Sequence, residues 1–289
     1  MTAGRAVLAA DLRALGLPAG ATVLVHASLR RVGPVDGGPA TVLAALCEVL
    51  GPGGTVVVPT HTAGNSITSP AFRAATAGMT AREAAEVADR IPPFDPDTSP
   101  AEGMGAFAEH VRRTSGAVRS RHPHTSFAAL GPAAADLTAV HDLDCHLGER
   151  SPLGALYAAG AFELLLGVDY TSCTGFHLAE YRLARPGPTR PHRCYVRDDT
   201  GRRTRLDFLA LHLDDSDFPR LGAAADGEPW ARRGRVGAGT GRLLPVRAAV
   251  DFAVDWMTVH RDRSRGSVHV CRCRYCDLAA VSPSDGSGG

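Results

Sequence analysis

A histidine and a glutamate three positions apart are the strongest candidates for chemistry in this sequence. His177 and Glu180 lie in the segment 167–180 (GVDYTSCTGFHLAE), and their spacing places both side chains on one face of a helix. A carboxylate beside an imidazole raises the basicity of the ring and fixes its tautomer, as a general base near neutral pH requires. Such a pair is more often an exposed helix ion pair, but its position just after an expected strand favours a site.

A glycine-rich turn near the N-terminus is a candidate anion-binding loop. Residues 26–33 (HASLRRVG) leave an expected strand, and Gly37 and Gly38 precede an expected helix. Backbone N–H groups between a parallel strand and a helix N-terminus can bind an anion. The segment lacks the Lys-Ser/Thr end of a Walker loop, and a glycine-rich turn is more often only a turn, so both interpretations stay open.

Two stretches carry charge of one sign. Residues 112–121 contain four arginines and no acid, and they run through HPHTSF into an expected buried strand. This segment could bind phosphates, or it could be a solvated helix end and loop. Residues 207–228 contain six acids against Arg220 alone, which could steer a cationic ligand or form a solvated helix face. The two stretches suggest one anionic and one cationic small-molecule partner.

Two further motifs resemble ligand-binding sites but are interpreted as having no such function. The segment 237–241 (GAGTG) resembles a dinucleotide loop, but Pro245 follows at once where a long helix is needed. Cys271, Cys273 and Cys276 with His269 offer four soft ligands within eight residues. A zinc site normally has a second, distant half, so a surface tail with free thiols is the preferred interpretation.

Metal-dependent chemistry is not expected. A metal-dependent amide hydrolase could use a set of histidines with Glu180, but the sequence has no HExxH or comparable ligand pair. The histidines of that alternative are His61, His122, His124 and His177. A non-catalytic binding or regulatory protein built around the cysteine cluster is a further alternative.

Composition indicates a soluble globular protein. The chain has 289 residues, is 44% hydrophobic and 21% charged, and carries a formal net charge of +1. Because no apolar run approaches the roughly 20 residues that a spanning helix needs, no membrane segment is expected. The N-terminus lacks the apolar core of a signal peptide, which favours a cytoplasmic protein. The near-zero net charge provides no field that would attract nucleic acid.

The elements that position these motifs are typical of an α/β protein with a mixed central sheet flanked by helices. Short β-branched or apolar runs predict strands over 21–26, 55–59, 126–130 and 162–168. Helical patterns predict helices over 39–50, from Ser151-Pro152 onward, over 171–184 and over 246–260. A polar turn at 198–201 predicts an antiparallel hairpin.

Residues 67–99 are expected to be a long surface excursion with one short helix, 81–88. Residues 1–265 are predicted to be one domain, and residues 266–289 a partly disordered tail.

The order and spacing of these motifs resemble the aminoglycoside 3-N-acetyltransferases, the acetyl-CoA-dependent antibiotic-resistance family, particularly its actinobacterial type. The resemblance covers about residues 5–265. It is carried by the segments 26–38 (HASLRRVGPVDGG), 56–66 (VVVPTHTAGNS), 116–131 (GAVRSRHPHTSFAALG) and 148–182, which ends in GFHLAEYR.

This resemblance implies an α/β fold distinct from the GCN5-like acetyltransferases. It also implies that acetyl-CoA binds near the first strand-to-helix loop and the HP-x-x-S segment, without a metal. The product would be an aminoglycoside acetylated at the 3-amino group of its 2-deoxystreptamine ring. The residues expected to bind acetyl-CoA are His26, Ser28, Leu29, Val32, Gly33, Arg119, His122, Ser126 and Phe127.

The resemblance also assigns catalytic roles. His177 matches the catalytic histidine of the family, and Glu180 matches the carboxylate that orients it. Hydroxyl and backbone N–H groups of residues 171–174, including Thr174, are expected to stabilise the oxyanion. Because no cysteine is needed as acyl carrier, we expect direct transfer in a ternary complex, with Cys173 as a bystander. The predicted aminoglycoside contacts are Asn65, Glu102, Asp169, Tyr170 and Asp214. The alternative is acetylation of a different amine in a biosynthetic pathway, and the protein could be a monomer or a homodimer.

Overall fold

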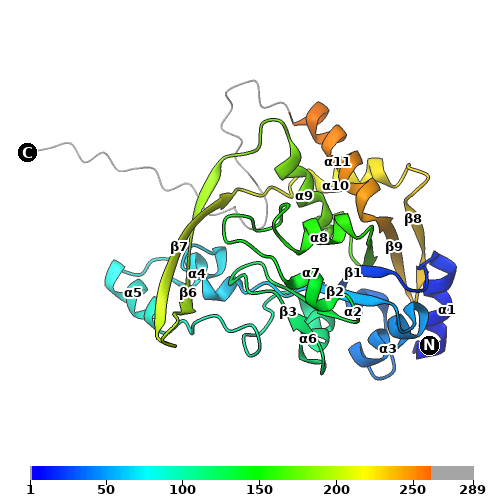
Figure 1. Ribbon diagram of the computed structural model, residues 1–289, viewed down its shortest axis with the longest axis horizontal. Helices are drawn as coiled ribbons and strands as arrows, with labels where there is room; N and C mark the ends of the chain where they lie inside the picture. The colour runs from blue at the N-terminus through cyan, green and yellow to red at the C-terminus, as the bar shows by residue number, and fades with distance from the viewer. Residues whose placement is uncertain (1, 262–289) are drawn as a thin grey trace, which may run out of the picture.

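A seven-stranded mixed sheet forms the centre of the computed structural model, which describes residues 2–261 (Figure 1). The strand order is β3-β4-β2-β1-β5-β9-β8, in which β2, β1 and β5 are parallel and the flanking pairs are antiparallel. A separate two-stranded sheet pairs β6 with β7. The strands are β1 (Thr22–Ala27), β2 (Thr55–Pro59), β3 (Val118–Arg119), β4 (Phe127–Leu130), β5 (Phe162–Leu166), β6 (Thr189–Arg197), β7 (Arg203–Leu211), β8 (Arg232–Val236) and β9 (Gly239–Pro245).

Helices cover both faces of the central sheet (Figure 1). They are α1 (Arg5–Leu15), α2 (Leu29–Val32), α3 (Pro39–Leu50), α4 (Pro70–Ala75), α5 (Ala81–Asp89), α6 (Gly105–Arg113), α7 (Ala134–Thr138), α8 (Pro152–Ala158), α9 (Gly175–Arg182), α10 (Phe218–Ala225) and α11 (Val246–His260), with two short 3-10 helices, η1 (Ala63–Asn65) and η2 (Tyr170–Ser172).

The alternation of side chains along the central strands creates two hydrophobic cores. In β1, Val23 and Val25 pack with α1, α3 and α6 on one face. Leu24 packs on the other face, with the helices α7 to α11. Successive side chains of a strand point to opposite faces, so a strand buried on both sides is apolar throughout. This confirms the expected mixed sheet flanked by helices.

Most of the expected elements are present, with shifted ends. The β1–α3–β2 unit is parallel as predicted, and the Ser151 hydroxyl caps α8 by accepting a hydrogen bond from the backbone N–H of Leu153. The helix expected over 171–184 begins later, because η2 and a break at Cys173 precede α9. No range was predicted for the helices α1, α2, α4, α6, α7 and α10 or for the strands β3, β8 and β9.

The glycine-rich segment 237–241 lies in the β8–β9 hairpin, which confirms that it is not a dinucleotide loop. Its glycines allow the hairpin to approach α2 closely. A Cβ at Gly239 would lie 2.5 Å from the carbonyl oxygen of Arg31, and a Cβ at Gly237 would lie 2.8 Å from that of Val32. This contact fixes the end of β1 and the loop that follows it.

The β6–β7 hairpin and the excursion after β2 are joined to each other. The amide of Asn65 donates to the carbonyl oxygens of Pro92 and Tyr195 and accepts from the N–H of Tyr195. The Arg203 guanidinium adds hydrogen bonds to the carbonyl oxygens of Ile91 and Ala88. Figure 1 shows α4 and α5 beside this hairpin. The excursion is therefore anchored and forms one wall with β6 and β7.

No helix within residues 2–261 is both long and apolar enough to cross a membrane. The predicted tail of residues 266–289, with His269 and the three clustered cysteines Cys271, Cys273 and Cys276, lies outside the described residues.

Candidate active site

A cavity of about 1010 Å³ opens at the carboxyl ends of the parallel strands. His26 and Ser28 line it from the end of β1, His61 from the segment after β2, and Val168 from the segment after β5. Ligands of open α/β sheets bind at this edge, because the loops that follow parallel strands meet there. The excursion, α6 and the β6–β7 hairpin supply the remaining walls.

His177 and Glu180 form a hydrogen-bonded pair at this cavity. The Nδ1 atom of His177 lies 2.6 Å from Oε2 of Glu180, and the histidine ring lines the cavity. The His177 side chain is 12% exposed, whereas that of Glu180 is 2% exposed. A carboxylate accepts the proton of Nδ1, which leaves the lone pair of the neutral ring on Nε2. The two side chains thus lie on one face of α9, as their spacing predicted, and the pair can act as an oriented base.

The second oxygen of Glu180 is held by residues that the sequence did not indicate. Its Oε1 atom accepts hydrogen bonds from the backbone N–H of Asp214 at 3.0 Å and from Nη1 of Arg261 at 2.6 Å. Arg261 also donates to both carboxylate oxygens of Asp217 and to the carbonyl oxygen of Asp214. Burial opposes the charge of Arg261, but the hydrogen bond to Asp217 and the charge of Glu180 outweigh it and raise its pKa. Glu180 is thereby held at both carboxylate oxygens inside the protein.

A second buried carboxylate, Glu163 on β5, holds the start of α9. Its oxygens accept hydrogen bonds from the backbone N–H of Gly175 at 3.2 and 3.3 Å and from the thiol of Cys173 at 3.3 Å. Nε2 of His26 lies 3.0 Å from Oε1 of Glu163, an ion-pair distance without hydrogen-bond geometry. A lone acid within the apolar run FELLL was the sequence signal for this residue. Burial and the neighbouring Glu163 raise the pKa of Cys173 well above its usual value, so the thiol is protonated.

Some of the oxyanion donors expected in residues 171–174 are used within the turn before α9. The backbone N–H groups of Thr171, Ser172 and Cys173 donate to Asp169 and Tyr170 within the turn. These three N–H groups are therefore used within the turn, and the expected role in oxyanion binding stays a prediction for Ser172 and Thr174, which both line the cavity. The Thr174 residue lines the cavity, and its hydroxyl has only a long contact of 3.5 Å with the carbonyl oxygen of Ser172.

Only some of the residues predicted to bind acetyl-CoA line the cavity. His26, Ser28 and Leu29 line the cavity, whereas Val32 and Gly33 support the loop by packing against the β8–β9 hairpin. The others lie in the interior and do not line the cavity. They are Arg119, His122, Ser126 and Phe127.

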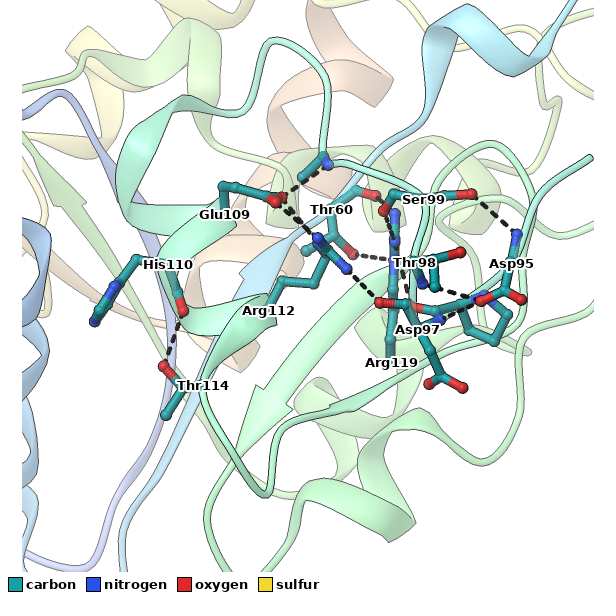
Figure 2. Close-up of polar contacts among 12 residues, drawn as sticks. Thr60, Asp95, Asp97, Thr98, Ser99, Glu109, His110, Arg112, Thr114 and Arg119 are labelled. Carbon is teal, nitrogen blue, oxygen red and sulfur yellow. Dashed lines mark hydrogen bonds and ion pairs between the residues drawn. The ribbon is translucent and has the colours of Figure 1, made fainter. Parts of the chain in front are cut away.

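The basic segment 112–121 is part of an internal network, shown in Figure 2. Nε of Arg119 donates to the hydroxyls of Thr60 and Ser126, and its terminal nitrogens donate to the carbonyl oxygens of Ser99 and Thr60. Burial lowers the pKa of Arg119 to about 10. Arg112 pairs with Glu109. Arg112 and Arg119 fasten the excursion to α6, β2 and β4, whereas Arg113 at the end of α6 and Arg121 in the following loop are exposed, as a solvated helix end and loop would have them.

The predicted aminoglycoside contacts are engaged in the framework around the cavity. Tyr170 is buried and donates to Asp226, exposed Asp169 caps η2, and Glu102 accepts from the backbone N–H of Gly64. Asn65 joins the excursion to β6, and the carboxylate of Asp214 accepts from the backbone N–H of Ser216. Of the six acidic residues in the stretch 207–228, Asp215 is the one that lines the cavity.

Cationic and neutral nitrogen groups line the remaining cavity wall. Arg30, Arg73 and Arg190 line it, and Nε of Arg73 is buried without a hydrogen-bond partner among the described residues. Arg30 lies in the segment 26–33 that the sequence marked as a candidate anion-binding loop, whereas no local pattern marked Arg73 or Arg190. Several histidines also line the wall. Burial, followed by neighbouring histidines, lowers the pKa of His124 to about 3, and burial with nearby Arg190 and His212 lowers that of His192 to about 4.

The comparison with known proteins identifies the class. Residues 24–258 match the family model described as aminoglycoside 3-N-acetyltransferase. The chain belongs to this family and is an acyltransferase, which confirms the resemblance seen in the sequence.

Individual relatives agree over nearly the whole chain. Aminoglycoside N(3)-acetyltransferase VIII of Streptomyces fradiae is 42% identical over 272 residues, which cover 89% of this chain and 92% of the relative. The solved structure of the YokD protein from Bacillus subtilis has a TM-score of 0.85 at 32% identity, covering 91% of this chain and 96% of the other.

Two further solved relatives carry ligands. AAC-IIIb in a binary complex with CoASH has a TM-score of 0.78 at 32% identity, covering 89% of this chain and 97% of the other. AAC-VIa bound to sisomicin has a TM-score of 0.74 at 28% identity, covering 89% and 98%. These neighbours are AAC(3) enzymes and not GCN5-like proteins, which confirms the expected fold class.

Proposed function

We propose that this protein transfers the acetyl group of acetyl-CoA directly to the 3-amino group of the 2-deoxystreptamine ring of an aminoglycoside, as a resistance enzyme. The observation that carries the proposal is the buried His177–Glu180 pair on the wall of a large cavity. The CoASH complex of AAC-IIIb and the sisomicin complex of AAC-VIa support both substrate classes.

The first chemical step is removal of a proton from the acceptor. An aminoglycoside amine is mostly protonated at neutral pH and has no lone pair for attack. Nε2 of His177 takes this proton, because Glu180 holds the proton of Nδ1 and stabilises the imidazolium that forms. The amine nitrogen then attacks the thioester carbonyl carbon.

The second step replaces the C–S bond by a C–N bond. The Thr174 hydroxyl is the side-chain donor that we assign to the developing oxyanion. As the tetrahedral intermediate collapses, the thiolate of CoA leaves and takes the proton from the imidazolium, and the nitrogen of the new amide releases its second proton to solvent. Cys173 takes no part in this sequence, because its thiol is protonated and bound to Glu163.

The charges along the cavity suit these two substrates. Arg30, Arg73 and Arg190 provide cations for the phosphates of acetyl-CoA, and Asp215 provides an anion for an aminoglycoside amine. A polyanion and a polycation can therefore bind in one cavity without a covalent enzyme intermediate. This arrangement favours a ternary complex.

The experiment is thiol release from acetyl-CoA by the purified protein with a 2-deoxystreptamine aminoglycoside, with the acetylated nitrogen located by NMR. We expect acetylation at the 3-amino group and a His177→Gln variant that has lost turnover. His260→Gln, which changes an exposed histidine on α11, is the matched control. Acetylation at another nitrogen would overturn the regiochemistry, and near-normal turnover of His177→Gln would overturn the base. A folded protein that binds CoA but acetylates none of several such drugs would point to a different amine.

A further inference from the structure

Three histidines from distant parts of the chain meet on the cavity wall. His124 lies in the turn before β4, His146 in the loop between α7 and α8, and His192 on β6. One ring nitrogen from each lies within 4.8 Å of the other two. The reaction proposed above uses none of these rings.

The rings converge and do not stack on one another. Their centroids are 4.4 to 5.4 Å apart, and the planes of the three pairs meet at 50° (His146–His192), 55° (His124–His192) and 88° (His124–His146). Nδ1 of His124 and Nε2 of His146 are buried and have no hydrogen-bond partner among the described residues, and the His146 residue is only 3% exposed. A buried polar nitrogen normally has a partner, so these two atoms require one.

Two further histidines fix the backbone that carries the first three. Nδ1 of His122 accepts hydrogen bonds from the backbone N–H groups of His124 and Thr125, and its Nε2 lies 3.3 Å from the carbonyl oxygen of Leu143. Nε2 of His141 lies 2.8 Å from the carbonyl oxygen of His146, and its Nδ1 lies 2.9 Å from the Ser120 hydroxyl. These two rings use both nitrogens in the framework. They support the ligand residues as outer hydrogen-bond partners do in metal sites.

We propose that His124, His146 and His192 form a binding site for a divalent transition-metal ion of the zinc class on the cavity wall. Imidazole nitrogens suit Zn²⁺, Co²⁺ and Ni²⁺, and three protein ligands are a common number for a zinc ion with an open position. Zn–N bonds of about 2.0–2.1 Å in a tetrahedral arrangement set the nitrogens about 3.4 Å apart. Small rotations of the side chains bring the three nitrogens to that spacing.

The surroundings define what such a site does. No carboxylate joins this cluster within residues 2–261, so the ion keeps its double charge. The fourth position faces the cavity, where an oxygen or nitrogen donor of a small molecule can replace water. Of these three ligands, only His124 was considered in the sequence, for a different metal site with Glu180; His146 and His192 follow no short spacing motif and were not predicted.

The test is a titration of the tag-free, full-length protein with Zn²⁺ by calorimetry, after dialysis against a chelator. Cys271, Cys273 and Cys276 are replaced by serine in every variant, because thiols are also zinc ligands. We expect one equivalent to bind, and Co²⁺ to give the weak visible bands of nitrogen ligation. His192→Gln is expected to weaken binding by at least about 10–100-fold. His110→Gln, on α6 and away from the cavity wall, should bind as the parent does.

Three results would overturn the site. They are no saturable binding in the serine background, equal affinity in His192→Gln and His110→Gln, and spectra that require sulfur ligands. His192 is half-buried, and thermal melts establish that each variant is folded; if His192→Gln does not fold, His124→Gln replaces it. The titration contains no substrate, so its result is independent of the proposed acetyl transfer.

Discussion

Replacing Glu180 by glutamine tests how the base is oriented, because it keeps the shape of the side chain and removes its charge. The carboxylate has donors at both oxygens, which are His177 Nδ1 at 2.6 Å on one side and Asp214 N at 3.0 Å with Arg261 Nη1 at 2.6 Å on the other. An amide has one acceptor oxygen and cannot satisfy both sides.

The structure determines which way the glutamine amide turns. Its oxygen faces Asp214 and Arg261, because the opposite orientation sets its NH₂ group against two donors, one of them cationic. The NH₂ group then faces Nδ1 of His177, which must accept, and the proton of the neutral ring moves to Nε2. The nitrogen at the cavity becomes a donor and is no longer a base. A comparable tautomer change in a serine protease lowers kcat by about 10⁴-fold.

We therefore expect Glu180→Gln to lower kcat by about 10³–10⁴-fold with little change in KM, since Glu180 does not line the cavity. Loss of the charge-assisted hydrogen bond should also lower the free energy of unfolding by about 1.5–3 kcal/mol. The assay is thiol release from acetyl-CoA. The control is Glu149→Gln. It removes an exposed carboxylate that pairs with Arg182, a residue of α9, the helix that also carries Glu180. A folded Glu180→Gln variant with kcat within tenfold of the parent would refute the argument.

Three other outcomes follow from the described contacts. Arg261→Met breaks a buried ion-pair network and should lower the free energy of unfolding in urea by about 3–5 kcal/mol, against less than about 1 kcal/mol for the exposed Arg82→Met; equal losses would show that the network contributes nothing. Cys173→Ser should leave thiol release within a few-fold of the parent, and the native thiol should resist iodoacetamide at neutral pH; rapid alkylation would contradict its raised pKa. Burial lowers the pKa of His61 well below its usual value and, for His141, to about 3, so below about pH 6.5 the unfolded chain binds protons that the folded chain does not. His141 should therefore reduce the free energy of unfolding by about 1.4 kcal/mol per pH unit as the pH falls from 6.5 toward 3, and His61 should act in the same direction; the measurement is urea unfolding with a chelator present, and a free energy of unfolding that is constant between pH 6.5 and 4.5 would oppose this.

The central strands that the sequence predicted are those whose burial is uniform. The runs 21–26 and 55–59 are apolar because they are covered on both faces, and the structure places β1 and β2 there. The strands β8 and β9 contain glycines because α1 and α2 approach the hairpin closely. They also contain arginines, and those of β8 are exposed at the edge of the sheet. Their composition therefore hides the strand pattern.

The candidate site likewise contains residues that the sequence predicted and residues that it did not. His177 and Glu180 were found because a local helical spacing brings them together. Arg261 meets Glu180 from 81 positions further along the chain, and no local pattern reports such a contact. The acidic stretch was noticed as a charge pattern, but the structure uses Asp217 to hold an arginine and leaves Asp215 on the cavity wall.

The position of Arg261 at the end of α11 links activity to local opening of the fold. In the last turn of this helix Met257 is buried in the core, but the Val259 residue is 74% exposed and His260 also lies at the surface, so no apolar contact of the core holds the end beyond Met257 among the described residues. The turn is held by the bonds of Arg261 itself and by its N–H bond to Met257. Helix ends of this kind open at a much lower free energy than the core. Warming should therefore release Glu180 from its anchor and inactivate the protein reversibly, while the central sheet is still intact.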